Sequence, residues 1–522
     1  MNRNYIYIFL ACILSYAFYL TFEFVYTDGQ MGVPLDDTWI HFQFADNFAK
    51  GYFYQYNPGE PTAGTTSPLY VIVLGSISFI IKNFIVSSIF ISALFHFLSC
   101  IFIYKLSLLI FESEYSPLKD LKSAFSPKFI SLMIAMLSVL AGRFTWSALS
   151  GMETTMFTFF CIAGIYFHVM NIQLRKFNLL PVVFLALATV SRPEGYLLCL
   201  LYFGDTLANL IKDGSFKRYF FKLLSAVGIF LILTLPYLIF SYSISGHFFP
   251  NTYRGQGGGF SILPNTEYLR IAFTYFFRDN LITGFMLMIS IPFYIINFKK
   301  YFSKFRSVNL IFLWLLILPF AFSIFIPNWR HHVRYLIPLI PFVNIITVYV
   351  LVSLMDGNHL LRLKSFIFKD QKRFACILIF SFVYFTVFAV ALGKNTDNIN
   401  SQQVKLAEWV HENVRRDETI ALNDIGAITF INKNRIIDMA GLVTPEILRY
   451  RTYQLDVNLD STNSLLKKNN VAYIIIYDNW YKEFLNKYKD NLTFVTSAVL
   501  EENTICGGIE MKVYKTNFNT KE

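Results

Sequence analysis

The stretch Gly32–Pro68 reads GVPLDDTWIHFQFADNFAKGYFYQYNPGEPTAGTTSP and follows the first long apolar run of the chain. Two neighbouring carboxylates, Asp36 and Asp37, stand near its start, ten residues beyond the expected end of a membrane span at Tyr26. Adjacent anions beside a membrane repel each other and lose hydration, which raises the pKa of such groups. We therefore expect one of the pair to be functional. The alternative is a span-exit turn in which Asp37 caps the helix that follows.

The composition is that of a membrane protein with many spans. Of the 522 residues, 55% are hydrophobic and 15% are charged, and the mean hydropathy is +0.46. Apolar runs of about 20 residues, the length that crosses a bilayer core, recur over the first three quarters. The net charge of +11 does not indicate nucleic-acid binding, because the basic residues cluster in short loops between these runs.

The charges of the loops predict the topology. Arg3 precedes the first span, so the N-terminus is expected in the cytoplasm and the acidic pair outside. If Ser67–Ile81 crossed the membrane, the later basic loops, such as Arg175-Lys176, would lie outside. This segment is also short for a span, so we expect a helix along the outer surface. Eleven spans are then expected, at residues 5–26, 84–104, 129–148, 155–172, 178–191, 196–211, 223–243, 280–297, 308–327, 335–354 and 374–393.

Two domains follow from this topology. Residues 1–393 form the membrane domain, with residues 27–83 as its first external loop, and residues 394–522 form an external α/β domain. An amphipathic helix is expected near Gln402–Arg415 of the second domain. Strands are expected at Thr419–Leu422, Arg435–Met439 and Val471–Tyr477.

The external loops carry candidate anion-binding residues, because a planar guanidinium binds phosphate through two parallel hydrogen bonds. The alternatives are an Arg192–Glu194 pair that anchors a helix junction, and lipid head-group contact near residue 330. The candidates are Arg192, Arg254, Arg330, His331, His332 and Arg334, and residues expected beside them are Glu153, Glu194, Asn251 and Tyr253. The six cysteines and eight histidines show no metal-binding pattern, so no cofactor is expected; a divalent metal on one Asp is the less favoured alternative.

A series of short motifs resembles a known family. They are DDTWI, ADNFAKG, NPGEPTAGTTSPLY, ALSGMET, SRPEG, FPNTY and RYLIPLIP, with NDIGAITF and RIIDMAGL in the tail. In this order they resemble the GT-C superfamily of polytopic glycosyltransferases, and within it the terminal β-(1→2)-arabinofuranosyltransferase branch with its bacterial relatives. The resemblance covers nearly the whole chain. It implies a polyprenyl-phosphate-sugar donor, juxtamembrane helices in the first external loop, an essential Asp there that matches Asp36 or Asp37, and a C-terminal domain that binds the acceptor.

The expected function is therefore that of an integral-membrane glycosyltransferase in a bacterial cytoplasmic (inner) membrane, with its site and C-terminal domain on the extracytoplasmic side. It would move a sugar, with arabinofuranose as one candidate, to a glycan, glycolipid or surface-protein acceptor. A carboxylate must take the acceptor's proton. We favour Asp36 as this base and Asp37 as a supporting residue. The alternative function is a transporter or flippase of lipid-linked glycans, although no inverted repeat is evident.

Overall fold

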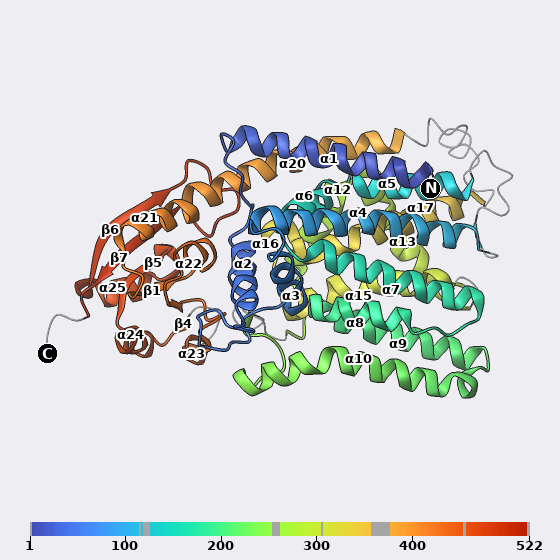
Figure 1. Ribbon diagram of the computed structural model, residues 1–522. Helices are drawn as coiled ribbons and strands as arrows, with labels where there is room; N and C mark the ends of the chain where they lie inside the picture. Colours follow the sequence, from blue (N-terminus) through green and yellow to red (C-terminus); the bar gives the residue numbers. More distant parts are fainter. Residues whose placement is uncertain are drawn as a thin grey trace.

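The computed structural model describes residues 3–113, 116–117, 126–252, 261–303, 306–356, 376–452 and 456–518. Within these residues the chain forms a helical bundle and a smaller α/β domain that packs against one end of it (Figure 1). Helices suit the apolar runs, because a helix satisfies the backbone N–H and C=O groups within the segment that carries them.

Seven helices in the described residues are long and apolar enough to cross a membrane, or eight if the bent pair α5 (Pro127–Val139) and α6 (Gly142–Leu149) forms one span. The chain is therefore a multi-pass membrane protein. The seven are α1 (Arg3–Tyr26), α4 (Phe84–Phe111), α7 (Thr154–Leu174), α10 (Phe216–Ser245), α15 (Arg306–Phe325), the run Arg330–Leu354, and the run Ile379–Asn413.

Every segment that the sequence predicts as a span is largely helical, but two of these helices are short, namely α8 (Leu180–Ser191) and α13 (Leu281–Ile296). Helix α9 (Glu194–Lys212) has 19 residues but is not among the seven. An unpredicted helix, α12 (Thr266–Asp279), joins the bundle. The run Arg330–Leu354 contains α16 (Arg330–Val333), the 3₁₀ helix η1 (Arg334–Leu339) and most of α17 (Ile340–Asp356). The remaining short helices of the bundle are α14 (Phe298–Ser303) and η3 (Cys376–Leu378).

Two helices of the first loop, α2 (Asp36–Ala49) and α3 (Pro68–Ile77), lie across the end of the bundle (Figure 1). They pack closely, since a Cβ on Gly75 would lie 2.8 Å from the carbonyl oxygen of Ala45. The helix expected at Ser67–Ile81 is thus present, and it does not run alongside the spans.

The C-terminal domain holds a five-stranded sheet in the order β2-β1-β5-β7-β6. Strands β1 (Thr419–Leu422), β2 (Ile436–Asp438) and β5 (Val471–Ile476) are parallel and confirm the three predicted strands. Strands β6 (Leu492–Val499) and β7 (Glu510–Thr516) pair antiparallel and were not anticipated. The other elements are α22 (Gly426–Asn432), α23 (Pro445–Tyr450), β3 (Arg451–Thr452), β4 (Asp456–Val457), α24 (Leu459–Lys468), η5 (Asp478–Trp480), α25 (Lys482–Lys487) and η6 (Lys489–Asn491).

One continuous helical run joins the two parts. It consists of α20 (Ile379–Ile399), a π-helical turn η4 (Asn400–Val404) and α21 (Lys405–Asn413), and it contains the expected amphipathic helix. The boundary expected at residues 393/394 falls inside this run, so the two parts share a helix.

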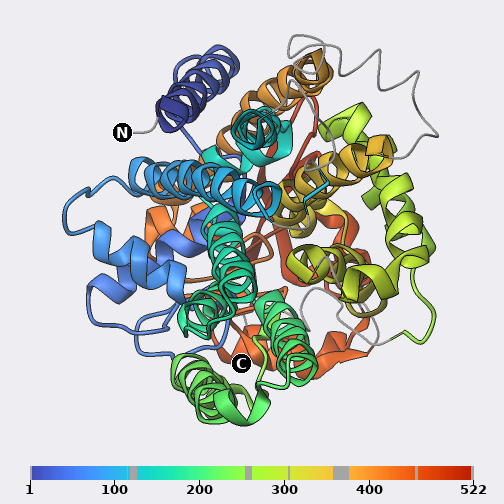
Figure 2. The same ribbon diagram turned by 90° about the vertical axis from the view of Figure 1, so that its right-hand side faces the viewer.

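The polar loops sort to the two ends of the bundle. The first turns of α8, α10 and α15 lie at the end away from the C-terminal domain, which faces the viewer in Figure 2. Arg306, which begins α15, pairs with Asp213 at 2.8 Å, and the hydroxyl of Tyr219, in the first turn of α10, donates to the carbonyl of Arg175 at 3.3 Å. These belong to the basic loops predicted to share one side of the membrane. The acidic pair and the other motifs predicted to lie opposite them gather at the end beside the domain.

Candidate functional site

Asp37 and Arg334 meet at the end of the bundle beside the C-terminal domain. The Nη2 group of Arg334 donates to Oδ2 of Asp37 at 2.5 Å. Asp37 lies in the first turn of α2, where a carboxylate is favoured by the helix dipole. Arg334 begins η1, directly after three left-handed residues with φ of 53°, 61° and 54° at His331, His332 and Val333. Such a conformation is costly for a β-branched valine, so packing must hold this turn in place.

A second ion cluster lies beside this pair. Arg192, between α8 and α9, donates from Nη1 to Glu153 at 2.8 Å and from Nη2 to Glu194 at 2.7 Å. His41 of α2 approaches the other oxygen of Glu153 at 3.2 Å. Arg192 and Glu153 are almost fully buried, at 3% exposure each. The predicted Arg192–Glu194 junction pair is therefore present, and it is part of a larger network.

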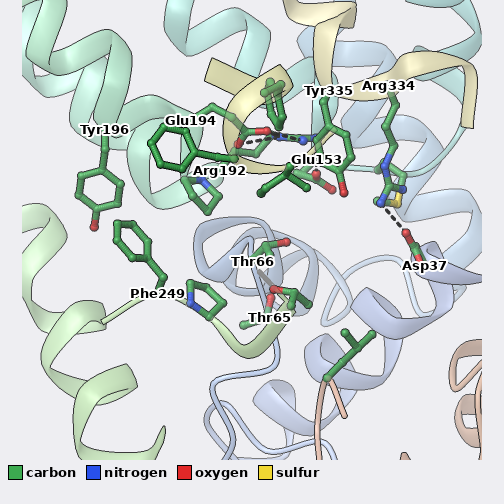
Figure 3. A pocket seen from close by; sticks show the side chains of 18 of the residues that line it. Asp37, Thr65, Thr66, Glu153, Arg192, Glu194, Tyr196, Phe249, Arg334 and Tyr335 are labelled. Carbon is green, nitrogen blue, oxygen red and sulfur yellow. Dashed lines mark hydrogen bonds and ion pairs between the residues drawn. The ribbon is translucent and has the colours of Figure 1, made fainter. Parts of the chain in front are cut away.

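Both ion clusters line one cavity of about 520 Å³ (Figure 3). Tyr335 and the loop residues Thr65 and Thr66 add hydroxyl groups, whereas Phe249 and Phe322 belong to an apolar wall. The lining comes from α2, the first loop, the α8–α9 junction, α15, η1 and Leu442 of the C-terminal domain. The cavity thus offers charged groups beside an apolar surface, as expected for a ligand with a charged head and an apolar tail.

The ionised form is favoured for both carboxylates that pair with the arginines, Asp37 and Glu153. Burial raises the pKa of Asp37, but Arg334, His331 and His41 together lower it by more, and the net pKa lies below its ordinary value. Burial also raises the pKa of Glu153, yet Arg192 and His41 bring it down to about 2. Two buried nitrogens of Arg334, Nε and Nη1, have no hydrogen-bond partner among the described residues. They are donors at the cavity that an anionic ligand would satisfy.

Asp36 has a different environment from Asp37. Its two oxygens accept hydrogen bonds from the backbone N–H groups of Gly426 and Ala427, at 2.8 Å each, and it does not line the cavity. Burial raises the pKa of Asp36 to about 8, with Asp424 as the next cause. Of the acidic pair, Asp36 therefore joins the first loop to the C-terminal domain and Asp37 faces the cavity.

Three of the predicted anion-binding residues that the structure describes, Arg330, His331 and His332, do not line the cavity. The Arg330 guanidinium lies 5.3 Å from the Trp480 ring, in a cation–π contact with the C-terminal domain. The His332 ring contacts Trp146 and its Nε2 lies 3.0 Å from the amide nitrogen of Asn395. His331, in the left-handed turn, is likewise absent from the lining.

Of the predicted site residues at positions 251–254, the structure describes only Asn251. The backbone N–H of Asn251 donates to the carbonyl of Ala63 at 3.1 Å, and its buried amide nitrogen has no hydrogen-bond partner in the described part of the chain. Its neighbour Thr252 lines the cavity. Tyr253, Arg254 and the glycines that follow lie outside the described residues.

The cavity residues that the sequence did not indicate include His41 and Tyr335. His41 lies four positions after Asp37 on α2, and residues at this spacing share a helix face, so the spacing was the available signal. Tyr335 follows Arg334 directly and stacks within 4.9 Å of the Arg192 guanidinium. Among the described residues, the one cluster of three potential metal ligands is Cys12, His96 and Cys100, none of which lines the cavity.

Several solved protein structures are similar to this chain in fold. ArnT from Cupriavidus metallidurans superimposes with a TM-score of 0.57 and 12% identity, over 96% of this chain and 97% of ArnT. A second ArnT structure, bound to undecaprenyl phosphate, has a TM-score of 0.56 and 11% identity, over 96% of this chain and 97% of ArnT. The Archaeoglobus fulgidus oligosaccharyltransferase has a TM-score of 0.55 and 12% identity, over 96% of this chain and 74% of that one. Arabinofuranosyltransferase AftD from Mycobacteria has a TM-score of 0.51 and 12% identity, over 98% of this chain and 40% of AftD.

The chain has the GT-C fold. The chain spans less than half of AftD but nearly the full length of ArnT. A family model described as "Domain of unknown function (DUF8728)" matches residues 397–514, which are most of the C-terminal domain. No curated protein matches the sequence. At these identities the likeness describes the fold, and the chemistry must be argued from the cavity.

Proposed function

We propose that the chain is an integral-membrane glycosyltransferase that moves a sugar from a polyprenyl-phosphate donor to a hydroxyl of an acceptor. The observation that carries this proposal is the cavity, which is lined by a carboxylate, Asp37, by the arginine that holds it, Arg334, with two unpaired donors, and by an apolar wall. A lipid-linked sugar phosphate needs these three features together. The ArnT structure with bound undecaprenyl phosphate supports this class of donor.

The donor phosphate is proposed to bind Arg334. Nε and Nη1 of this residue are buried without partners, whereas Arg192 is already held by Glu153 and Glu194. A phosphate at Arg334 would compete with Asp37 for the guanidinium. As the bond between the sugar and the phosphate breaks, its electron pair goes to the phosphate oxygen and the polyprenyl phosphate leaves with an additional negative charge, so a fixed cation that faces this oxygen stabilises the transition state.

This competition would prepare Asp37 as the base. Arg334 holds the pKa of Asp37 low, and a carboxylate with a low pKa is a weak base. When the phosphate takes over the guanidinium, Asp37 loses its counter-ion and its pKa rises. The carboxylate is then released at the cavity, where it accepts the proton of the attacking hydroxyl. Asp36, bonded to Gly426 and Ala427, is proposed to position α2 rather than to react.

The polyprenyl chain is proposed to enter along the apolar wall. Phe249 and Phe325 line the cavity and yet remain 51% and 43% exposed, so the wall continues to the outer surface of the bundle. An apolar surface of this kind on a membrane protein contacts lipid. The acceptor would approach from the other side, where Leu442 of the C-terminal domain contributes to the lining.

The finer assignments are part of the same proposal. The sugar is a pentose or hexose, with arabinofuranose as the first candidate because of the motif resemblance, and the acceptor is a glycan, glycolipid or surface protein. The membrane is the bacterial cytoplasmic membrane, with the cavity and the C-terminal domain on its outer side. The gathering of basic loops at the opposite end of the bundle supports this orientation.

The test is sugar transfer by the purified full-length protein in detergent, where movement across a bilayer has no meaning. A panel of polyprenyl-phosphate pentoses and hexoses is offered with glycan acceptors, and products are identified by mass spectrometry. Asp37→Asn should abolish transfer. Asp46→Asn, on the same helix but paired with Lys50 and Lys433, should retain it. Undiminished transfer by Asp37→Asn would disprove the mechanism, and lipid movement in vesicles without transfer would favour the flippase.

A further inference from the structure

A cluster of soft metal-binding side chains lies within the bundle, away from the cavity. Cys12 of α1 faces His96 and Cys100 of α4, and the three potential ligand atoms lie within 4.8 Å of one another. His96 and Cys100 are four positions apart, so they share one face of α4. All three are buried, at 1%, 0% and 0% exposure. The sequence did not reveal the cluster because its third member lies on another helix.

The hydrogen bonds of Tyr16 determine which nitrogen of His96 is free. The Tyr16 hydroxyl donates to the carbonyl of Ala93 at 3.0 Å and lies 2.7 Å from Nδ1 of His96. A phenol has one proton, and a carbonyl accepts only, so that proton goes to Ala93. Nδ1–H of His96 must then donate to the Tyr16 oxygen. Nε2 is left as a bare lone pair, buried and with no hydrogen-bond partner among the described residues.

This arrangement matches the surroundings of a metal-bound histidine. Such a histidine usually makes a hydrogen bond through its second ring nitrogen, which fixes the tautomer and orients the ring. Here Tyr16 has this role. A lone pair without a donor inside an apolar bundle is costly, and a cation would satisfy it.

We propose that Cys12, His96 and Cys100 bind a thiophilic divalent cation, with Zn²⁺ as the fitting ion. Thiolate and imidazole are the ligands that zinc prefers. On loading, each thiol releases its proton to solvent and each sulfur binds the metal. Zn²⁺ with two thiolates and a neutral imidazole carries no net charge, which suits the low dielectric of a membrane bundle. A monovalent ion with the same ligands would leave a buried negative charge.

The expected consequence is a tie between α1 and α4. α1 lies at the rim of the bundle (Figure 2) and buries a narrow stripe of residues: Ile8, Cys12, Ser15, Tyr19 and Glu23. Cys12 lies near the middle of this stripe. α1 also leads directly into the loop that carries Asp37. A metal at Cys12 would therefore hold the helix that precedes the cavity, without taking part in transfer.

The experiment measures metal on the full-length protein in detergent. The protein is stripped with a chelator, dialysed against Zn²⁺, and its zinc content determined by plasma mass spectrometry. Wild type and the control Cys199→Ser, which changes a buried cysteine outside the cluster, should hold one zinc per chain. Cys12→Ser and Cys100→Ser should lose it, and Tyr16→Phe should weaken zinc affinity about 10- to 100-fold.

Cobalt gives a second measurement on the unaltered protein, for the case that a variant does not fold. Co²⁺ bound to wild type should show the thiolate-to-metal charge-transfer band, and Zn²⁺ should remove the band and raise the melting temperature. Three results would overturn the proposal: no zinc on wild type with its thiols free, equal zinc on Cys12→Ser and Cys100→Ser, or a wild type in which these two cysteines are oxidised to each other.

Discussion

Oδ2 of Asp36 accepts a 2.8 Å hydrogen bond from the backbone N–H of Gly426, although 390 positions separate the two residues. A Cβ at residue 426 would lie 2.2 Å from the carbonyl oxygen of Asp36, so the contact requires glycine. This bond fixes one carboxylate of the acidic pair at the junction with the C-terminal domain. The neighbouring carboxylate, Asp37, is left to face the cavity with Arg334.

Replacing each aspartate with asparagine should therefore affect different properties, catalysis for Asp37 and docking of the C-terminal domain for Asp36. Asp37→Asn is expected to lower kcat about 10²- to 10⁴-fold, the usual contribution of a general base, without faster proteolysis at the domain junction. Asp36→Asn is expected to retain more activity and to weaken docking of the domain, seen as faster limited proteolysis. Equal losses of kcat without any effect on proteolysis would contradict this division.

Gly426→Ala should loosen the junction, because its new methyl group would overlap with the backbone of Asp36. We expect a lower melting temperature and earlier proteolytic release of the C-terminal domain. Gly204→Ala is the matched control: it adds the same methyl group in α9, where nothing lies within 4 Å. That control should stabilise the helix by up to about 1 kcal/mol. Similar melting curves for both variants would argue against the close contact.

The burial of Asp36 predicts a pH dependence of stability. Its pKa is raised from 3.8 to about 8, so between these values the folded protein keeps a proton that the unfolded chain has lost. The contribution of Asp36 to the free energy of unfolding should therefore be greatest below pH 4 and fall as the pH rises toward 8. The difference between wild type and Asp36→Asn in thermal unfolding, followed from pH 4 to 8, measures this contribution. A difference that grows with pH would have the wrong sign.

Arg334→Lys keeps a positive charge but loses the planar group whose Nε and Nη1 are unpaired. If these nitrogens bind the donor phosphate, KM for the donor should rise about 10- to 100-fold, as expected for a lost hydrogen bond to a charged group. Arg330→Lys is the control, since Arg330 stacks on Trp480 outside the cavity lining. Initial rates over a range of donor concentrations give KM for the two variants. An equal rise in KM in both would show that the donor phosphate does not bind Arg334.

Breaking a buried ion pair that the sequence did not indicate should destabilise the bundle. Nε of Arg143, on α6, donates to Oδ1 of Asp279, on α12, at 2.9 Å, and Arg143 is 0% exposed. Asp279→Ala would leave this cation buried and unpaired, at a cost of about 3–5 kcal/mol. The control is Glu267→Ala, which removes an exposed ion pair with Arg270 and should leave the melting temperature nearly unchanged, because solvent screens such a pair. Melting temperatures in detergent measure both, and comparable losses would contradict the prediction.

The sequence alone indicated the membrane class, the helical segments of the bundle and the helix at Pro68–Ile77. Apolar length and loop charge are local properties, so they can be read before the chain is folded. Apolar length and loop charge also predicted that one end of the bundle carries Glu153, Arg192, Glu194 and Arg334, because these residues flank the ends of predicted spans. All four line the cavity.

Only the tertiary structure decided which aspartate faces the cavity. Neighbouring residues on a helix point about 100° apart. The sequence around Asp36 does not indicate that the backbone of Gly426 will bind this carboxylate. The Asp37–Arg334 pair, the Arg143–Asp279 pair and the Cys12–His96–Cys100 cluster likewise join separate helices. Such contacts depend on how helices pack and rotate against one another. Residue type and spacing along a single segment do not specify that arrangement.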